Sequence, residues 1–171
     1  SKQLVDFGFV GDVDFANGRR LAALIKPQEG VEAVVPVVAP LTHDGKGNIL
    51  NTNADTIAGE VAAALAEEFD VELLYVFEYP GVMQNPDDLT SVIPHINREK
   101  FDQLAADGVV AGGMLPKLEN CLKAVERGVH QVRITRLEES AATGENVINS
   151  DAADTSQRVG RFAPGTLITL S

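Results

Sequence analysis

The chain has 171 residues, of which 44% are hydrophobic, and its 25 acidic and 14 basic residues give a formal net charge of −11. This composition suits one soluble globular domain with a sizeable core, and its negative field disfavours nucleic acid and anionic lipid as partners. The most apolar window, residues 31–41, is interrupted by Pro36 and Pro40 and is too short for a membrane helix. No signal peptide is expected at the first residue. Because Cys121 is the single cysteine, no disulfide can form within the chain, and we expect a cytoplasmic protein.

The first third of the chain contains three predicted elements and a turn. Residues 5–13 (VDFGFVGDV) alternate apolar and polar side chains around two glycines, which favours a short strand pair or a bulged ribbon. Asp14 predicts the cap of a helix over residues 15–25. The β-branched run VVPVVAP at residues 34–40 is typical of a strand buried on both faces. The two glycines of HDGKGN at residues 43–48 predict a turn.

The rest of the chain alternates predicted helices and strands. This alternation indicates a single α/β domain over residues 1–171, with a parallel or mixed sheet. Residues 136–164 are polar and rich in Ser, Ala, Asp and Gly, so we expect a flexible loop there. Strands are expected over residues 72–78, 131–135 and 166–170, and helices over residues 55–68, 96–106 (Phe101 and Leu104 inward) and 116–127 (Leu118, Leu122 and Val125 inward).

Three short polar residues, Asn51, Asn53 and Asp55, stand at the start of the helix expected over residues 55–68. Asn or Asp at such a position can accept a hydrogen bond from a free backbone amide and cap the helix. One cap needs one residue, so spare amide side chains beside this helix N-terminus can hold a small anionic ligand. The alternative is a capped helix after a polar turn, with no ligand.

A second candidate site is the string GGMLPK at residues 112–117. The paired glycines let backbone amides approach an oxyanion, and Lys117 lies at the start of the following helix. A loop, a helix dipole and a cation together can bind phosphate. An ordinary loop before a helix that begins with Pro116 is the alternative.

Other site motifs are absent from the sequence. There is no P-loop, because GxxxxGK[ST] does not occur, and no G-x-S-x-G nucleophile motif. His43, His95 and His130 lack HExxH spacing and cysteine partners, so we expect no metal site. Cys121 is interpreted as a small residue that faces the core from its helix.

Several segments, in their order along the chain, make the sequence resemble the acetylglutamate kinases of the amino acid kinase family. They are VDFGFVGDV from Val5, PVVAPLTHDGKGNILNTNADTIAGE from Pro36, GGMLPKLENCLKAVERGV from Gly112 and GTLIT from Gly165. The resemblance covers most of the chain and implies a three-layer αβα sandwich with a mainly parallel sheet. It also implies phosphorylation of the side-chain carboxylate of N-acetyl-L-glutamate in arginine biosynthesis, with ATP and with Mg²⁺ bound through the nucleotide.

The resemblance implies roles for individual residues. Asn51 and Asn53 would bind the acylated glutamate, Asp55 would orient catalytic lysines, and Lys117 would neutralise charge on the transferring phosphoryl group. Phosphoryl transfer needs mainly alignment and positive charge, which agrees with these residue types. The nucleotide would be lined by Glu78, Tyr79, Pro80, Gly81, Val82, Met83, Val109, Val110, Ala111, Gly113 and Met114.

The chain departs from the family pattern in two places that bear on activity. The family's opening third, with a strand-borne lysine and a glycine-rich phosphate loop, has no counterpart before Val5. The chain would then be the C-terminal, nucleotide-side portion of the fold, with weak nucleotide binding and little turnover alone. The strand over residues 72–78 ends in Phe77-Glu78, where the family usually has Ser or Thr followed by Asp.

Three alternatives to acetylglutamate phosphorylation stay open. In the first alternative, the phosphoryl acceptor is N-succinylglutamate. In the second, the chain is another amino acid kinase, and in the third it is a non-catalytic nucleotide-binding module. A homodimer is compatible with the resemblance. Residues 136–164 show no sequence pattern that would indicate feedback inhibition by arginine.

Overall fold

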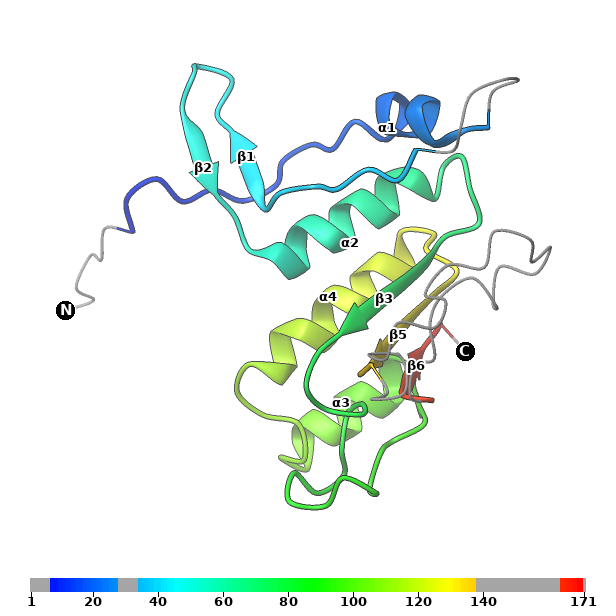
Figure 1. Cartoon of the computed structure of the whole chain (residues 1–171). Helices are drawn as coiled ribbons and strands as arrows, with labels where there is room; N and C mark the ends of the chain where they lie inside the picture. The colour runs from blue at the N-terminus through cyan, green and yellow to red at the C-terminus, as the bar shows by residue number, and fades with distance from the viewer. Residues whose placement is uncertain (1–6, 28–33, 138–163, 171) are drawn as a thin grey trace.

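The computed structural model describes residues 7–27, 34–137 and 164–170 (Figure 1). The flexible loop expected over residues 136–164 falls almost entirely outside these ranges. The elements in chain order are α1 (Gly18–Ile25), β1 (Leu41–His43), β2 (Ile49–Asn51), α2 (Ala54–Leu65), β3 (Glu72–Val76), β4 (His95–Ile96), α3 (Arg98–Ala106), α4 (Met114–Glu126), β5 (Gln131–Thr135) and β6 (Thr166–Ile168).

Four strands form the main sheet in the order β3-β5-β6-β4. β3 and β5 run parallel with Tyr75 opposite Ile134, and β4 and β6 run parallel with Ile96 opposite Ile168. β5 and β6 run antiparallel. The predicted α/β fold with a mainly parallel sheet is therefore confirmed.

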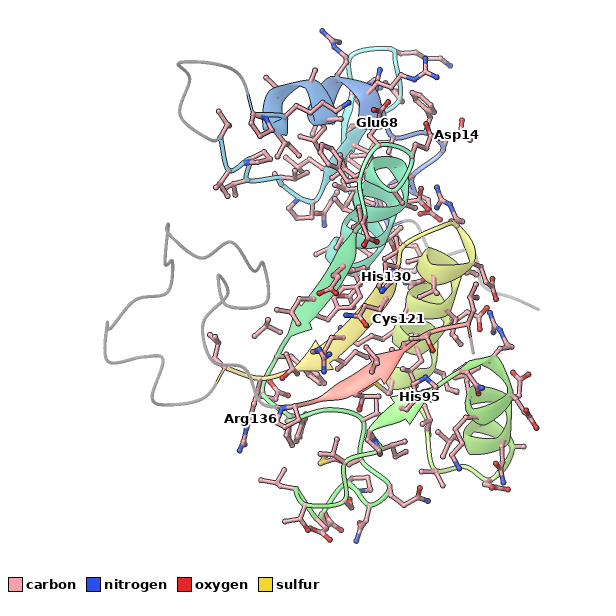
Figure 2. All side chains as sticks on the ribbon, turned by 90° about the vertical axis from the view of Figure 1, so that its right-hand side faces the viewer. Asp14, Glu68, His95, Cys121, His130 and Arg136 are labelled. Carbon is pink, nitrogen blue, oxygen red and sulfur yellow. The ribbon has the colours of Figure 1, made fainter. Side chains whose placement is uncertain are left out.

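Helices α2, α3 and α4 contact the strands of this sheet. Figure 2 places α3 and α4 on the same side of it. The sheet and these helices correspond to two adjacent layers of the three-layer sandwich that the sequence predicts.

The hydrophobic core lies between the helices and the sheet. Cys121 is completely buried there, which confirms its interpretation as a core residue. The core-facing positions predicted from helical spacing are also confirmed: Phe101 and Leu104 on α3, and Leu118, Leu122 and Val125 on α4.

The hairpin of β1 and β2 lies apart from the main sheet (Figure 1). Its turn contains Gly45 and Gly47 at φ of 71° and 101°, which confirms the predicted turn. Residues 7–13, the described part of the predicted strand pair, form no strand of their own. Val10 makes a parallel bridge to Asn51, whose backbone bonds to Phe9 and Gly11, so this segment pairs with the end of β2 and not with itself.

The start of α1 differs from the prediction. Asn17, not Asp14, is the cap, and its side chain accepts a hydrogen bond from the Arg20 amide at 3.2 Å. The helix therefore begins at Gly18, where the chain passes close to the backbone of α2. It ends at Ile25, just before Pro27, as predicted.

The prediction of a buried strand over residues 34–40 is wrong. These residues form no strand, and Val35 and Val37 are 80% and 96% exposed. The run has the residue types of a buried strand, but among the described residues no neighbouring strand pairs with it.

Smaller differences concern where elements begin and end. β3 stops at Val76, two residues earlier than predicted, and α2 stops at Leu65. β4 was not predicted, because two residues are too short to show a pattern; it pairs with β6, and Asn97 then caps α3. No helix in the described ranges has the length and apolar character needed to cross a membrane.

Candidate active site

Asp55 and Lys117 form an ion pair although 62 residues separate them along the chain. The Lys117 ammonium Nζ lies 2.7 Å from Asp55 Oδ2. Asp55 is in the first turn of α2, and Lys117 lies one turn into α4. The two side chains are 33% and 22% exposed, so both are accessible to a ligand.

Helices α2 and α4 pack side by side with their N-termini at the same end. The parallel direction follows from two ion pairs: Asp55 meets Lys117 near the starts of the helices, and Glu60 meets Arg127 further along. Each helix N-terminus carries a partial positive charge. Two such ends beside a lysine favour an anion at this position.

Two aromatic residues of β3 and its extension complete the surroundings of Lys117. Its ammonium lies 5.2 Å from the centroid of the Tyr75 ring and 5.6 Å from that of Phe77, within cation–π range. The Tyr75 hydroxyl donates a hydrogen bond of 2.8 Å to the backbone carbonyl of Asp55. Burial raises the pKa of Tyr75. This hydroxyl therefore stays protonated and fixes the start of α2 to the sheet.

Tyr75 and Phe77 were not among the residues assigned from the sequence. The sequence did offer one signal: Tyr75 and Phe77 are two positions apart, and alternate residues of a strand lie on the same face. The sequence alone does not show that this face meets Lys117.

The two asparagines differ in what they contact. Asn53 is the cap of α2: its side-chain oxygen accepts a hydrogen bond from the Thr56 amide at 3.1 Å. Asn51 ends β2, where its backbone bonds to Phe9 and Gly11, and the residue is exposed. The capping interpretation thus applies to Asn53, and Asn51 has an exposed side chain close in sequence to Asp55.

The glycine pair before α4 is open to a ligand. Gly112 has a φ of 56°, and a Cβ built on Gly112 or Gly113 would meet nothing within 4 Å. The amides of Met114 and Leu115 already donate turn hydrogen bonds of 3.3 Å, and Pro116 has no amide proton. The ammonium of Lys117 is therefore the main anion-binding group at this helix start.

The residues assigned to the nucleotide differ in exposure. Glu78, Tyr79 and Ala111 are exposed, whereas Val82 and Val110 belong to the core. The Tyr79 ring packs edge-on against Phe77 at 5.9 Å between centroids, so the start of this loop lies beside the surroundings of Lys117. Pro80 and Gly81 are buried, and Met83, Val109 and Met114 are partly buried.

A hollow of about 160 Å³ opens between α2 and α4 and reaches Asp55. It is smaller than the roughly 300 to 1,000 Å³ of typical ligand pockets. In the ranges that the structure describes, no group of three or more His, Cys, Asp or Glu side chains could hold a metal ion. The hollow is lined by Asp55, Thr56, Gly59 and Glu60 of α2 and by Asn120, Lys123, Ala124, Glu126 and the adjacent Arg127 of α4.

Comparison with known proteins identifies the family. The sequence profile of the Amino acid kinase family matches residues 5–136, which is more than half of the chain. The chain belongs to the amino acid kinase family.

Curated relatives of this chain carry the name acetylglutamate kinase. The protein of Phocaeicola vulgatus is 57% identical over 131 residues, which cover 77% of this chain and 49% of the relative. The protein of Cytophaga hutchinsonii is 45% identical over 137 residues, covering 80% of this chain and 50% of the relative. The chain thus spans about half the length of the curated relatives it matches.

Solved structures agree with the family fold. The structure of smu.665 from Streptococcus mutans superimposes with a TM-score of 0.66 at 28% identity, covering 99% of this chain and 56% of that one. The N-acetylglutamate synthase from Neisseria gonorrhoeae has a TM-score of 0.54 at 24% identity, covering 77% of this chain and 27% of that one, and supports the fold alone.

Proposed function

We propose that this chain belongs to an enzyme that transfers a phosphoryl group from ATP to the side-chain carboxylate of N-acetyl-L-glutamate, in arginine biosynthesis and in the cytoplasm. The observation that carries the proposal is the ion pair of Lys117 and Asp55 at the joined N-terminal ends of α4 and α2. The names of relatives up to 57% identical support the reaction and the acceptor.

The site fits a reaction that develops negative charge. ATP would supply the phosphoryl group, and Mg²⁺ would be held through the nucleotide. Lys117 would neutralise charge on the equatorial phosphoryl oxygens, and both helix N-termini add positive potential. Asp55 and the rings of Tyr75 and Phe77 hold the ammonium in one place, which reduces the reorganisation needed during transfer.

The test compares two lysine variants in an active form of the protein. We would fuse to this chain the part of the Phocaeicola vulgatus acetylglutamate kinase that it does not match, and measure acylglutamyl phosphate as its hydroxamate. Lys117→Met should lower kcat by about 100-fold or more, the scale expected for losing a preorganised charge. The control is Lys100→Met on α3, which should keep the parent kcat. An active fusion whose kcat is the same with Lys117→Met would refute the role of Lys117.

The chain alone is proposed to turn over little, because it spans about half of its relatives. Robust hydroxamate production by the 171-residue chain would contradict this expectation. N-succinylglutamate and other amino acid carboxylates, tested as a panel with the fusion, decide which acceptor is used.

The alternative function is a non-catalytic nucleotide-binding module. Thermal unfolding separates the two functions, since a ligand that binds the folded state raises its melting temperature. The kinase predicts that MgATP and N-acetyl-L-glutamate each raise Tm in the fusion. The module predicts a rise with MgATP alone.

A further inference from the structure

Three aromatic residues stand at alternate positions along β3 and the residues that continue it. Tyr75 lies opposite Ile134 in the sheet. The Phe77 amide donates a hydrogen bond of 3.0 Å to the Thr135 carbonyl, so pairing with β5 extends one residue past the end of β3. The Phe77 and Tyr79 rings pack edge-on, with 5.9 Å between their centroids. We call Tyr75, Phe77 and Tyr79 the aromatic row.

The aromatic row leads from the core to the surface, and Lys117 lies at its inner end. Tyr75 is buried, Phe77 is partly buried and Tyr79 is 40% exposed. The Lys117 ammonium lies over the Tyr75 and Phe77 rings, and its side chain is 22% exposed. A ring attracts a cation more strongly when part of the water around the cation is removed. The two inner rings are therefore in a position to hold this ammonium.

Lys117 must change its anionic partner in order to act on a phosphoryl group. Its ammonium now lies 2.7 Å from Asp55 Oδ2, whereas in phosphoryl transfer it would face a phosphoryl oxygen. A lysine side chain is flexible, and its charge can follow either anion. A ring fixed in a strand attracts the whole charge, and the three N–H donors of the ammonium stay directed at oxygen atoms. Rings can thus keep the ammonium in place while its anionic partner changes.

We propose that Tyr75 and Phe77 are positioning residues for phosphoryl transfer. Their ring faces hold the Lys117 ammonium at one point while it exchanges the Asp55 carboxylate for a phosphoryl oxygen. Tyr79 supports Phe77 from the solvent side through the edge-on contact. The role in transfer rests on the proposed function, whereas the contact between the rings and the ammonium is tested without turnover.

Nuclear magnetic resonance tests the contact. In the chain labelled with ¹³C-lysine, ring currents should shift the ε-methylene signal of Lys117 upfield, and Lys117→Arg identifies this signal by its loss. Phe77→Leu should reduce the shift. The matched control is Phe101→Leu, the same change at a ring that lies beside Arg98 on α3, and it should leave the shift as in the parent. An unshifted Lys117 signal in the parent would overturn the proposal.

The same signal tests the exchange of partners. In the fusion with the unmatched part of the Phocaeicola vulgatus enzyme, MgATP at a concentration that raises Tm should leave the upfield shift in place, because the rings still hold the ammonium. Loss of the shift when MgATP binds would show that Lys117 leaves the rings, and would overturn the proposal.

Kinetics of the fusion test the effect on transfer. Phe77→Leu keeps an apolar side chain but removes the ring, and it should lower kcat roughly 3- to 30-fold, the range for losing one cation–π contact, with the KM for N-acetyl-L-glutamate unchanged. Phe77→Tyr keeps a ring and should restore kcat to within about twofold of the parent. Phe101→Leu should keep the parent kcat. In a Lys117→Met background, Phe77→Leu should cause no further loss, because the ring acts through the ammonium.

Two kinetic results would overturn the proposal. One is an equal loss of kcat in Phe77→Leu and Phe77→Tyr, because the second variant keeps the ring. The other is a loss from Phe77→Leu that is the same with and without Lys117. Circular dichroism checks the fold of each variant, and Phe77→Met, which also lacks a ring, replaces Phe77→Leu if that variant does not fold. An inactive parent fusion would contradict the proposed function, and the lysine signal would then still decide whether the rings hold the ammonium.

Discussion

Thr166 joins three backbone segments through one buried hydroxyl. Its Oγ1 accepts a hydrogen bond of 2.8 Å from the Val82 amide and donates one of 2.7 Å to the Ile93 carbonyl. The residue is completely buried. It therefore fixes the loop that follows β3, which includes residues assigned to the nucleotide, against β6.

Thr166→Val keeps the side-chain shape but leaves two buried backbone groups without a partner. We expect it to lower the free energy of unfolding by about 2 to 6 kcal/mol, since each such group costs about 1 to 3 kcal/mol. Urea unfolding measures the effect. Thr90→Val, in the exposed loop, is the control and should change stability by less than about 1 kcal/mol. Equal effects of the two variants would contradict this account.

Cys121 gives a pH-dependent contribution to stability. Burial raises the pKa of its thiol to about 12, from an ordinary value of 9.0. The unfolded chain then ionises this thiol between pH 9 and 12 while the folded chain does not. The contribution is fully present below pH 9 and is lost as pH rises toward 12.

Between pH 8 and pH 10, the parent should therefore lose about 1 kcal/mol more free energy of unfolding than Cys121→Ala does. The comparison of the two proteins removes the effect of Tyr75, whose raised pKa acts in the same direction in both. Urea titrations at the two pH values measure it. Identical losses in parent and variant would refute the contribution of the thiol.

At the site, the sequence predicted the charged residues but not their surroundings. Asp55 and Lys117 each stand in a recognisable string, NTNAD or GGMLPK, and the structure brings them within 2.7 Å. Tyr75 and Phe77 stand in an ordinary apolar strand, and their proximity to Lys117 depends on how β3 packs against α4. Contacts of that kind are set by tertiary packing, which single-sequence patterns do not contain.

At the scale of elements, the same substitution at two glycines should have opposite effects. Gly59 is in the middle of α2, and a Cβ there would meet only the Tyr75 hydroxyl, at an ordinary 3.7 Å. Gly18 begins α1, where a Cβ would clash with the backbone carbonyl of Ala64 in α2. There is thus room for a Cβ at Gly59 within α2, and there is none at Gly18, where α1 meets α2.

Gly59→Ala should stabilise the protein by roughly 0.5 to 1 kcal/mol, because alanine loses less backbone entropy in a helix. Gly18→Ala should destabilise it by about 1 to 3 kcal/mol, because α1 must move away from α2. Thermal or urea unfolding of both variants gives the two signs. Stabilisation by both would show that α1 does not pack on α2 as described.

The elements differ in how well the sequence predicted them. α4 and β5 were predicted nearly to their ends, because each buries a face whose spacing is visible along the chain. β4 was missed because a strand of two residues is too short to show an alternating pattern of apolar and polar side chains. Residues 34–40 were predicted as a buried strand from their composition, but a strand also needs a neighbour, and the described residues supply none.

Across the whole molecule, the described residues divide into a packed part and a weakly packed part. β5 is paired on both sides, by β3 and β6, and Val132 and Ile134 are completely buried. Residues 34–40 have no strand partner among the described residues. Local opening of a protein depends on how many buried contacts and paired amides must be broken.

Hydrogen exchange of the chain alone should therefore show two levels of protection. Amides of β5 should exchange through global unfolding, with the slowest rates in the molecule, because their bonds break only when the core opens. Amides of residues 34–40 should exchange without measurable protection, and those of the β1–β2 hairpin should lie between. Mass spectrometry of peptic fragments over a time course measures all three segments in one sample. If residues 34–40 were as protected as β5, this segment would have a strand partner within the chain that the described residues do not show.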